Sequence, residues 1–376
     1  MAAISTSWVA SGAPGQSPRV CLVGPLPPPS GGMANQCEQL LRLMGQDGMA
    51  MTLVRTNAPF RPEWVARLPL LRALFRLLPF IWQLWRGIGR ADVVHIFANS
   101  GWSWHLIAAP ALAIARWRGV GAIVNYRGGH ADTFFATAPP GVLRALASAR
   151  LRVTPSAYLL RVFARHGLDA EIIPNIVDLS RFRFAPAHAF GSAPHLIVTR
   201  NLEDIYDIPT ALRAFARVRQ IFPDARLTVA GTGPQRAALV QMAAALNLTR
   251  CVHFCGRIDN LEIPALYASA DGLFNPSTVD NMPISLLEAM ACGVPFVSTN
   301  AGGIPDLVDS GRTGWLVPVG DDGAMAERMI ALLQDSAGRM RICESARQHV
   351  AAFAWPEVRE QWLSAYRRAA AQGATA

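Results

Sequence analysis

The chain has 376 residues, 51 % of them hydrophobic, and a formal net charge of +9. This length predicts two domains of ordinary size, each with enough apolar residues for its own core. The six cysteines include no C-x-x-C pair, which argues against a disulfide framework or a cysteine metal site and favours a reducing cytoplasm.

The charge is unevenly placed, and every basic residue is an arginine. Residues 1–185 hold 19 arginines against eight acids, whereas residues 186–376 hold 16 arginines against 18 acids. A basic N-terminal half favours an anionic partner for that half. No nucleic-acid recognition motif is present, so we expect an anionic membrane surface or a phosphate-bearing acceptor and no nucleic acid.

The first elements are typical of a Rossmann-like domain. Residues 1–18 lack the basic start and apolar core of a signal peptide, and we expect a disordered tail there. The apolar run 19–24 predicts a buried strand, and a helical pattern covers 34–44. The loop between them contains Gly31 and Gly32, whose amides could bind a diphosphate, although a lone Gly-Gly pair equally fits a tight turn.

Residues 61–90 are apolar and rich in arginine, and we expect Pro69 and Pro79 to interrupt the helical pattern of this segment. The segment fits two interpretations equally. One is a surface helix packed on its domain. The other is a helix that lies in a membrane interface, with Trp82 and Trp85 as anchors.

Residues 93–115 carry no charged side chain, which raises the question of a spanning helix. Polar and proline residues interrupt the run, so a strand, a loop and a buried helix explain it better. His95 lies inside the predicted strand 91–97, where a histidine is expected to be part of the core rather than a catalyst.

Further short runs complete the predicted organisation. Strands are expected at 122–126, 195–200 and 225–234, the last ending in a glycine turn. Between Leu179 and Pro194, aromatic residues alternate with Pro, Gly, Ser and Arg, which is typical of an interdomain linker. We therefore place the first domain at 19–185 and the second at 186–354.

The most informative stretch runs from residue 271 to residue 318. A strand is followed by a loop that carries Asp280, and a helix begins near Pro283. Glu288 lies inside this helix, and Gly293 ends it. A ligand with phosphates above the helix N-terminus could contact both carboxylates and several free backbone N–H groups.

The surrounding string resembles the donor-binding segment of retaining glycosyltransferases of the GT-B fold, family 4 (group 1). That pattern has an acid, seven residues, a glutamate, A-M-A-x-G-x-P, then G-G before an acid and T-G; the first acid is usually a glutamate. The matching residues are Asp280, Glu288, Ala289, Met290, Ala291, Gly293, Pro295, Gly302, Gly303, Asp306, Thr313 and Gly314. The resemblance implies two Rossmann-like α/β domains facing each other across a cleft, and transfer of a sugar from a nucleotide-diphosphate donor.

The resemblance extends to the first domain. The loop with Gly31 and Gly32 matches the family's P-x-S-G-G donor loop, and strand ends at 153–156 and 172–178 close the domain. Family members often carry a histidine after the strand that here ends at residue 126. That position holds Arg127, which could bind a phosphate, and His130 could serve as a displaced equivalent.

In the second domain, the resemblance assigns the donor diphosphate to an arginine and a lysine after its first strand. Arg200 matches the arginine, but the chain contains no lysine. Arg127 or Arg257 could supply the missing charge. Three further groups are expected to contact the donor. They are the glycine turn at Gly233, the nucleobase segment Gly256, Arg257 and Ile258, and the helix start Asn281, Met282, Pro283 and Ile284.

The implied reaction moves a glycosyl unit to an acceptor hydroxyl with retained configuration. Glu288 is expected to accept hydrogen bonds from the ribose hydroxyls, and Asp280 to contact the sugar near the reacting face. Because no D-x-D triplet occurs in the chain, we expect no metal and no other cofactor.

The expected partners are a nucleotide sugar and a glycan or lipid-linked acceptor, in cell-surface polysaccharide or glycolipid synthesis. We expect a cytoplasmic protein, peripheral on the membrane, whose final helix at about 355–372 packs on the first domain. Two alternatives remain open. They are a non-catalytic GT-B subunit that binds a glycan or partner, and a nucleotide-sugar epimerase of the same architecture.

Overall fold

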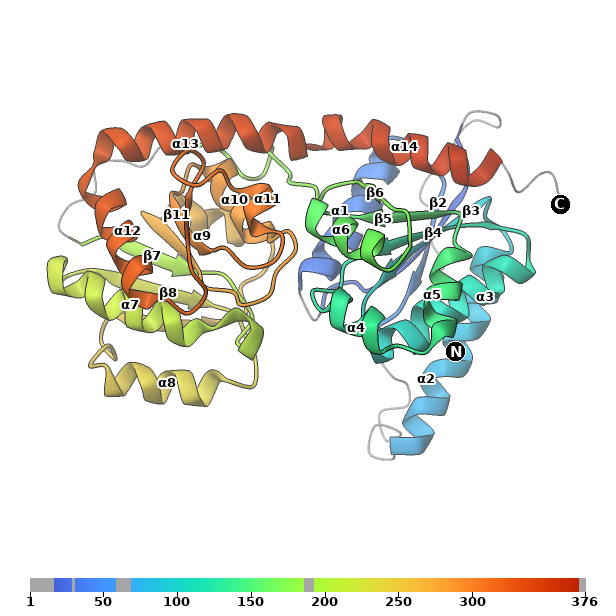
Figure 1. Ribbon diagram of the computed structural model, residues 1–376, viewed down its shortest axis with the longest axis horizontal. Helices are drawn as coiled ribbons and strands as arrows, with labels where there is room; N and C mark the ends of the chain where they lie inside the picture. The colour runs from blue at the N-terminus through green and yellow to red at the C-terminus, as the bar shows by residue number, and fades with distance from the viewer. Residues whose placement is uncertain (1–16, 29–30, 59–68, 186–192, 372–376) are drawn as a thin grey trace. The chain divides into compact units, whose positions relative to one another are not determined.

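A computed structural model describes residues 17–28, 31–58, 69–185 and 193–371. Nearly all of the tail expected at 1–18 lies outside these residues. The chain divides into two compact units, Met1–Ile176 with Val358–Ala376, and Val177–Glu357. Each unit is a parallel six-stranded sheet covered by helices (Figure 1).

The sheet of the first unit has the strand order β2-β1-β3-β4-β5-β6, and all its pairs are parallel. Its strands are β1 (Val20–Gly24), β2 (Met51–Arg55), β3 (Val93–Ala98), β4 (Gly121–Tyr126), β5 (Leu151–Thr154) and β6 (Glu171–Ile172). Helices cover both faces, so the central strands are fully buried and their sequences are almost continuously apolar. The helices of this unit are α1 (Gly32–Gln46), α2 (Pro69–Ile88), η2 (Trp104–Ala108), α3 (Ala109–Trp117), α4 (Ala131–Thr137), α5 (Pro140–Ala147), α6 (Ala157–Arg165) and most of α14 (Trp355–Ala371).

Helix α14 packs on the sheet of the first unit, at its central strands. The Nδ1 atom of His95 lies 2.8 Å from the hydroxyl of Tyr366, and the His95 ring stacks on Trp362 at 4.5 Å. The backbone of α14 comes so close to β4 that a Cβ on Gly121 would lie 2.1 Å from the carbonyl oxygen of Ala369. His95 is completely buried, so its interpretation as a core residue is confirmed.

The prediction that Pro79 breaks the segment 61–90 is wrong, because α2 runs through Pro79 without a break. Proline removes one backbone hydrogen bond from the helix interior. The turns after it are nevertheless held by packing, since Phe80, Leu84 and Ile88 enter the core of the first unit. The part of this segment from 61 to 68 lies outside the described residues.

Residues 93–115 form β3, the π-helix η2 and most of α3, in agreement with the predicted strand followed by a buried helix. Within the described part of the chain, no helix is long and apolar enough to cross a membrane.

The second unit has a sheet of order β12-β11-β10-β7-β8-β9, again parallel throughout. Its strands are β7 (His195–Val198), β8 (Arg226–Ala230), β9 (Val252–Gly256), β10 (Gly272–Asn275), β11 (Phe296–Thr299) and β12 (Trp315–Val317). Its helices are η3 (Asp204–Tyr206), α7 (Ile208–Ile221), α8 (Arg236–Ala245), α9 (Ile263–Ala268), α10 (Ile284–Cys292), α11 (Ile304–Leu307), α12 (Asp322–Gln334), α13 (Ser336–Val350) and η4 (Ala351–Phe353).

The boundary between the units falls earlier than the expected 185/186. The amide of Val177 donates to the carbonyl of Phe353 at 3.0 Å, and the amide of Ala185 donates to the carbonyl of Cys292 at 3.1 Å. Phe182 between them is buried in the core of the second unit. The first residues of the expected linker 179–194 therefore belong to the second unit. Burial of the apolar Phe182 ring in that core stabilises this arrangement. Residues 186–192 of that linker lie outside the described part.

The strand order of the second sheet reverses between β7 and β10. From β7 the chain continues to β8 and β9 on one side, whereas β10, β11 and β12 extend the other side. In open parallel sheets, ligands bind at the carboxyl ends of the strands beside such a switch point. Arg200 follows β7 and Asp280 follows β10, so both lie at this position.

Candidate active site at the switch point of the second sheet

Arg200 and Asp280 form an ion pair at the switch point. The Nη2 atom of Arg200 lies 2.6 Å from Oδ2 of Asp280, and the two side chains are only 12 % and 13 % exposed. The Nε atom of Arg200 donates to Oδ1 of Asn275 at 2.7 Å, and Nδ2 of Asn275 donates to Ser298 at 2.8 Å. Because the last residue of β10 and a serine of β11 hold it in this way, the guanidinium has a fixed orientation.

The loop that carries Asp280 is held by the glycine pair after β11. The amide of Gly303 donates to the carbonyl of Asp280 at 2.9 Å. Gly302 has φ +54°, and a Cβ at this position would lie 2.1 Å from the same carbonyl oxygen. Only glycine allows both this backbone conformation and this approach. The carboxylate is aimed by its own loop, since Oδ1 accepts from the amide of Asn281 at 2.9 Å.

Helix α10 begins at Ile284, directly after Pro283, and ends at Gly293 with φ +76°. Both ends therefore fall where the sequence predicted them. Pro283 carries no N–H, so it cannot donate to a ligand and must be removed from the expected backbone donors. Leu286 already donates to the carbonyl of Pro283, which leaves the amides of Ile284 and Ser285 as first-turn donors for an anion.

Glu288 lies in the second turn of α10, and its environment favours the neutral form. Burial raises the pKa of its carboxyl to about 7, while the Tyr267 hydroxyl and the charges of Arg181 and Arg200 oppose the shift. Tyr267 is fully buried. Its hydroxyl lies 3.0 Å from Oγ1 of Thr199 and donates to the carbonyl of Ser285 at 3.1 Å. Tyr267 therefore ties the end of β7 to the helix that carries Glu288.

Asp280 is also subject to opposing effects. Burial raises the pKa of its carboxyl, and Arg200 together with the following backbone amides lowers it. The net effect raises the pKa of Asp280, and the ion pair with Arg200 limits that rise. The second unit thus brings one cation, two carboxylates and a helix N-terminus to one edge of its sheet, a set that can bind phosphates and sugar hydroxyls together.

The glycine turns after β8 and β9 lie at the same edge. A Cβ on Gly233 would lie 2.2 Å from the carbonyl oxygen of Leu202, so this loop packs directly on the residues after Arg200. Gly256 has φ +73° and accepts from Gly231 at 2.8 Å. Arg257 is exposed and Ile258 half-buried at the end of β9. β9 is the outermost strand, and no ion pair of Arg257 with a described residue is recorded.

In the first unit, Gly31 caps the N-terminus of α1 and Gly32 is its first residue. The guanidinium of Arg127 contacts residues of the first unit. Its Nε donates to Asn125 at 3.1 Å, its Nη1 donates to Asn175, and the group lies 5.0 Å from the Phe97 ring. Burial lowers the pKa of Arg127 to about 10. His130 is exposed at the start of α4.

Sequence reasoning missed three contributors to the second unit's site: Tyr206, Tyr267 and Asn275. The guanidinium of Arg200 lies 5.1 Å from the Tyr206 ring. Asn275 could have been predicted from the sequence, because it is a polar residue at the end of a fully buried strand. Tyr206 and Tyr267 could not, since their positions depend on how separate segments pack.

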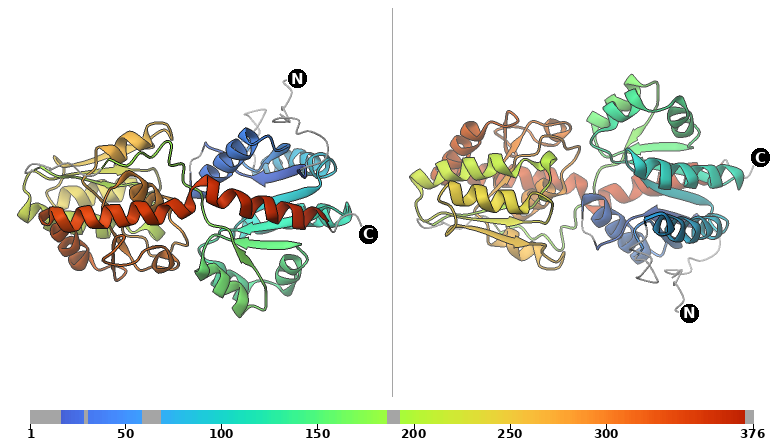
Figure 2. Two further views of the ribbon diagram at one scale, coloured as in Figure 1. Left: turned by 90° about the horizontal axis from the view of Figure 1, so that it is seen from above. Right: turned by 90° about the horizontal axis from the view of Figure 1, so that it is seen from below.

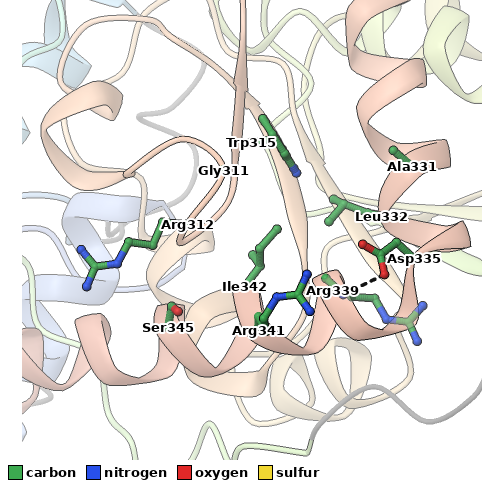
Figure 3. Close-up of a pocket in the computed structure, with 11 residues that line it drawn as sticks. Gly311, Arg312, Trp315, Ala331, Leu332, Asp335, Arg339, Arg341, Ile342 and Ser345 are labelled. Carbon is green, nitrogen blue, oxygen red and sulfur yellow. Dashed lines mark hydrogen bonds between the residues drawn. The ribbon is translucent and has the colours of Figure 1, made fainter.

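A concave pocket of about 350 Å³ lies elsewhere on the second unit (Figure 3). Trp315 and Arg339 are among the residues that line it. Trp315 is the first residue of β12, and all strands of the sheet are parallel. The pocket therefore lies at the amino edge of the sheet, opposite Arg200 and Asp280, and is separate from the candidate site.

Comparison with known proteins agrees with the geometry. The family model described as "Glycosyltransferase Family 4" matches residues 30–181, and the one described as "Glycosyl transferases group 1" matches residues 183–349. The structure of the Anabaena protein HepE in complex with UDP-glucose superposes with a TM-score of 0.72 at 17 % identity, over 93 % of this chain and 99 % of that one. The fold is therefore GT-B.

Two curated relatives are similar in sequence. A glycogen synthase of Mycobacterium tuberculosis is 29 % identical over 282 residues, which are 72 % of this chain and 67 % of the relative. A phosphatidyl-myo-inositol mannosyltransferase of Mycobacterium leprae is 30 % identical over 213 residues, 55 % of this chain and 56 % of the relative. Both halves of the chain therefore match glycosyltransferase family models. The chain belongs to the family 4, group 1 glycosyltransferases.

Proposed function

We propose that this protein transfers a sugar from a nucleotide-diphosphate donor to an acceptor hydroxyl with retention of configuration. The observation that supports the proposal most directly is the largely buried Arg200–Asp280 pair beside the N-terminus of α10. A largely buried cation next to free helix amides suits a diphosphate, and a carboxylate at hydrogen-bonding distance from that cation suits the attached sugar.

Each residue has a distinct task in this proposal. Arg200 and the amides of Ile284 and Ser285 stabilise the negative charge that develops on the diphosphate as the bond to the sugar breaks. Glu288 accepts hydrogen bonds from the ribose hydroxyls, and Asp280 holds a sugar hydroxyl. The family's phosphate-binding lysine is absent, so Arg200 carries more of the diphosphate charge than its counterpart in a site with two cations.

The donor proposal can be tested before the sugar is known. A ligand at 100 times its dissociation constant stabilises a protein by about 2.7 kcal/mol, so each nucleoside diphosphate can be screened by thermal unfolding. HepE was solved with UDP-glucose, which makes UDP the first compound to test. A nucleoside diphosphate should raise the melting temperature of the wild type, and Arg200→Gln should remove the shift. If none of them stabilises the wild type, the proposal fails.

For the acceptor, we propose a glycan or a lipid-linked glycan in cell-surface polysaccharide or glycolipid synthesis. The similarity to a mannosyltransferase whose name gives a phosphatidyl-inositol acceptor supports this class. The excess of arginine in the first half supports an anionic membrane surface as a further partner. Mass analysis of products formed from nucleotide sugars with membrane extracts would detect such acceptors.

The same assay separates the two rival functions. A non-catalytic subunit would bind a nucleotide diphosphate without consuming any nucleotide sugar. An epimerase would convert one nucleotide sugar into its isomer without releasing the diphosphate. Release of the diphosphate together with a glycosylated acceptor supports transfer.

A further inference from the structure

Two helices of the first unit expose large aromatic side chains. α2 and α3 lie side by side (Figure 2), and the rings of Trp85 and Trp117 are 4.5 Å apart. Trp117 is 72 % exposed, Trp82 57 % and Leu78 61 %. We call this the tryptophan–arginine surface; its residues are Leu78, Trp82, Trp85, Arg86, Arg116, Trp117 and Arg118.

Exposure of these side chains is not a by-product of core packing. On α2, Phe80, Leu84 and Ile88 already form the buried stripe that faces the sheet. Leu78, Trp82 and Trp85 follow the spacing i, i+4, i+7 and form a second apolar stripe, which faces away from the core. A helix on an ordinary soluble domain carries polar residues there. A contiguous exposed apolar patch instead marks a binding surface.

Arginines are interleaved with these rings. The guanidinium of Arg118 lies 3.9 Å from the centre of the Trp85 ring, and that of Arg86 lies 4.6 Å from the Trp82 ring. The Nε atom of Arg118 is buried without a hydrogen-bond partner among the described residues. Gly89 makes room for this side chain, because a Cβ there would lie 2.5 Å from Nη1 of Arg118.

No acid neutralises this positive charge within the described part of the chain. Arg86, Arg116 and Arg118, the arginines of this surface, form no ion pair with a described residue. Asp92 is the single acid between residues 69 and 118, and it pairs with Arg19 at 2.7 Å. The surface therefore presents several cations around apolar rings.

We infer that the tryptophan–arginine surface is the site at which this protein docks on a lipid bilayer that contains anionic lipids. Tryptophan rings are favoured at the level of the lipid head groups, and arginines bind the phosphates of those head groups. An acidic glycan would also meet the arginines. It gains nothing from the leucine, however, and the surface carries no carboxylate to bind sugar hydroxyls. The inference deepens the membrane partner proposed above and does not depend on the sugar transferred.

The structure also predicts how strongly each group contributes. One arginine near an anionic surface changes affinity about fivefold, so replacement of two should weaken binding on the order of 20-fold. The effect should shrink as salt rises, because exposed charges are screened. Loss of two exposed tryptophans should weaken binding about tenfold or more at every salt concentration, since burial of apolar area is not screened.

The test is flotation of the full chain with vesicles of phosphatidylcholine alone, or of phosphatidylcholine with phosphatidylglycerol. Wild type should float with the second and not with the first. Trp82→Ser with Trp117→Ser, and separately Arg86→Gln with Arg116→Gln, should both lower binding. Brominated acyl chains should quench wild-type tryptophan fluorescence, and this quenching should be weaker in the tryptophan variant, which retains only Trp85 of the three surface tryptophans.

Matched changes elsewhere provide the control. Ile221→Ser with Val319→Ser removes comparably exposed apolar groups from the second unit, and Arg250→Gln with Arg367→Gln removes two exposed arginines. Both should float like wild type. All variants should retain the melting shift caused by nucleoside diphosphates, which separates this inference from the proposed transfer. The inference is wrong if wild type ignores anionic vesicles at low salt, if the control variants lose as much binding as the surface variants, or if an acidic polysaccharide binds the surface and vesicles do not.

Discussion

The guanidinium of Arg200 and the carboxylate of Asp280 meet at 2.6 Å, although 80 positions separate them in the chain. Two neighbouring strands at the switch point of the sheet bring them together. The pair leaves Arg200 partly neutralised before any donor binds. In the proposed reaction a diphosphate shares this cation with Asp280, and the sugar of the donor lies beside the carboxylate. The short contact would then link the phosphate-binding and sugar-binding parts of the proposed site.

The first prediction concerns the glycine that supports this pair. Gly302→Ala should lower the free energy of unfolding by about 1–3 kcal/mol, because an alanine must adopt φ +54° and its Cβ would lie 2.1 Å from the Asp280 carbonyl. Turnover should fall as well, since the loop that positions Asp280 must move.

Gly320→Ala is the matched control. Gly320 has φ +79° but nothing within 4 Å of an added Cβ. An alanine at this position therefore has the same kind of backbone strain as Gly302→Ala, but its Cβ does not clash with a neighbouring atom. The variant should lose stability without losing turnover. Equal turnover by the two variants, measured as release of the diphosphate from the donor, would show that Gly302 does not position Asp280.

The second prediction is a pH dependence of donor binding. The pKa of Glu288 is raised to about 7 by burial, so the acid that should accept ribose hydrogen bonds becomes protonated as the pH falls through neutrality. Nucleotide affinity should therefore be higher at pH 8 than at pH 6, and Glu288→Gln should flatten this step.

The same shift has the opposite consequence for the protein without ligand. The folded state binds this proton more tightly than the unfolded chain, whose pKa is near 4.5, so Glu288 costs stability as the pH rises from about 4.5 to 7. The full cost is on the order of 3 kcal/mol above pH 7. Glu288→Gln should consequently raise the melting temperature at pH 8 while it weakens nucleotide binding. A lower melting temperature at pH 8 would contradict this account.

The third prediction is that transfer survives chelation. The chain has no D-x-D triplet, and the described residues hold no group of three or more His, Cys, Asp or Glu side chains that could bind a metal. Arg200 and the N-terminus of α10 supply positive charge at the same place. Turnover should be unchanged in EDTA. Loss of turnover that magnesium or manganese restores would contradict the prediction.

Much of this site follows from local sequence patterns, and the remainder from packing. Asp280, Glu288 and the start and end of α10 depend on spacing within one segment, so the sequence predicts them. Tyr267 could not be predicted, because its partners Thr199 and Ser285 belong to separate segments. The continuous course of α2 through Pro79 was missed for the same reason: core packing on the far side of the helix outweighs the proline's local cost.

The last prediction separates the roles of the two acids. Glu288→Gln should weaken nucleoside diphosphate binding as well as turnover, because a hydrogen bond to a charged group contributes about 1.5–3 kcal/mol. The corresponding loss of affinity is roughly tenfold to a hundredfold. Asp280→Asn should leave affinity for the free nucleotide within about threefold, since the neutral amide keeps the shape of the side chain and the proposed function assigns Asp280 to the sugar. Turnover of the same variant should collapse.

Asp280→Glu completes the series by restoring the longer acid that the family usually has. The carboxylate here lies 2.6 Å from Arg200 in a loop fixed by Gly302 and Gly303, so an added methylene must displace one partner. We expect partial activity with nucleotide affinity intact. Nucleotide affinity is measured by titration calorimetry and turnover by release of the diphosphate from the donor. If Asp280→Asn transfers sugar at the wild-type rate and Glu288→Gln binds nucleotide like wild type, the assignment of both acids is wrong, and the site must be sought among other residues of the second unit.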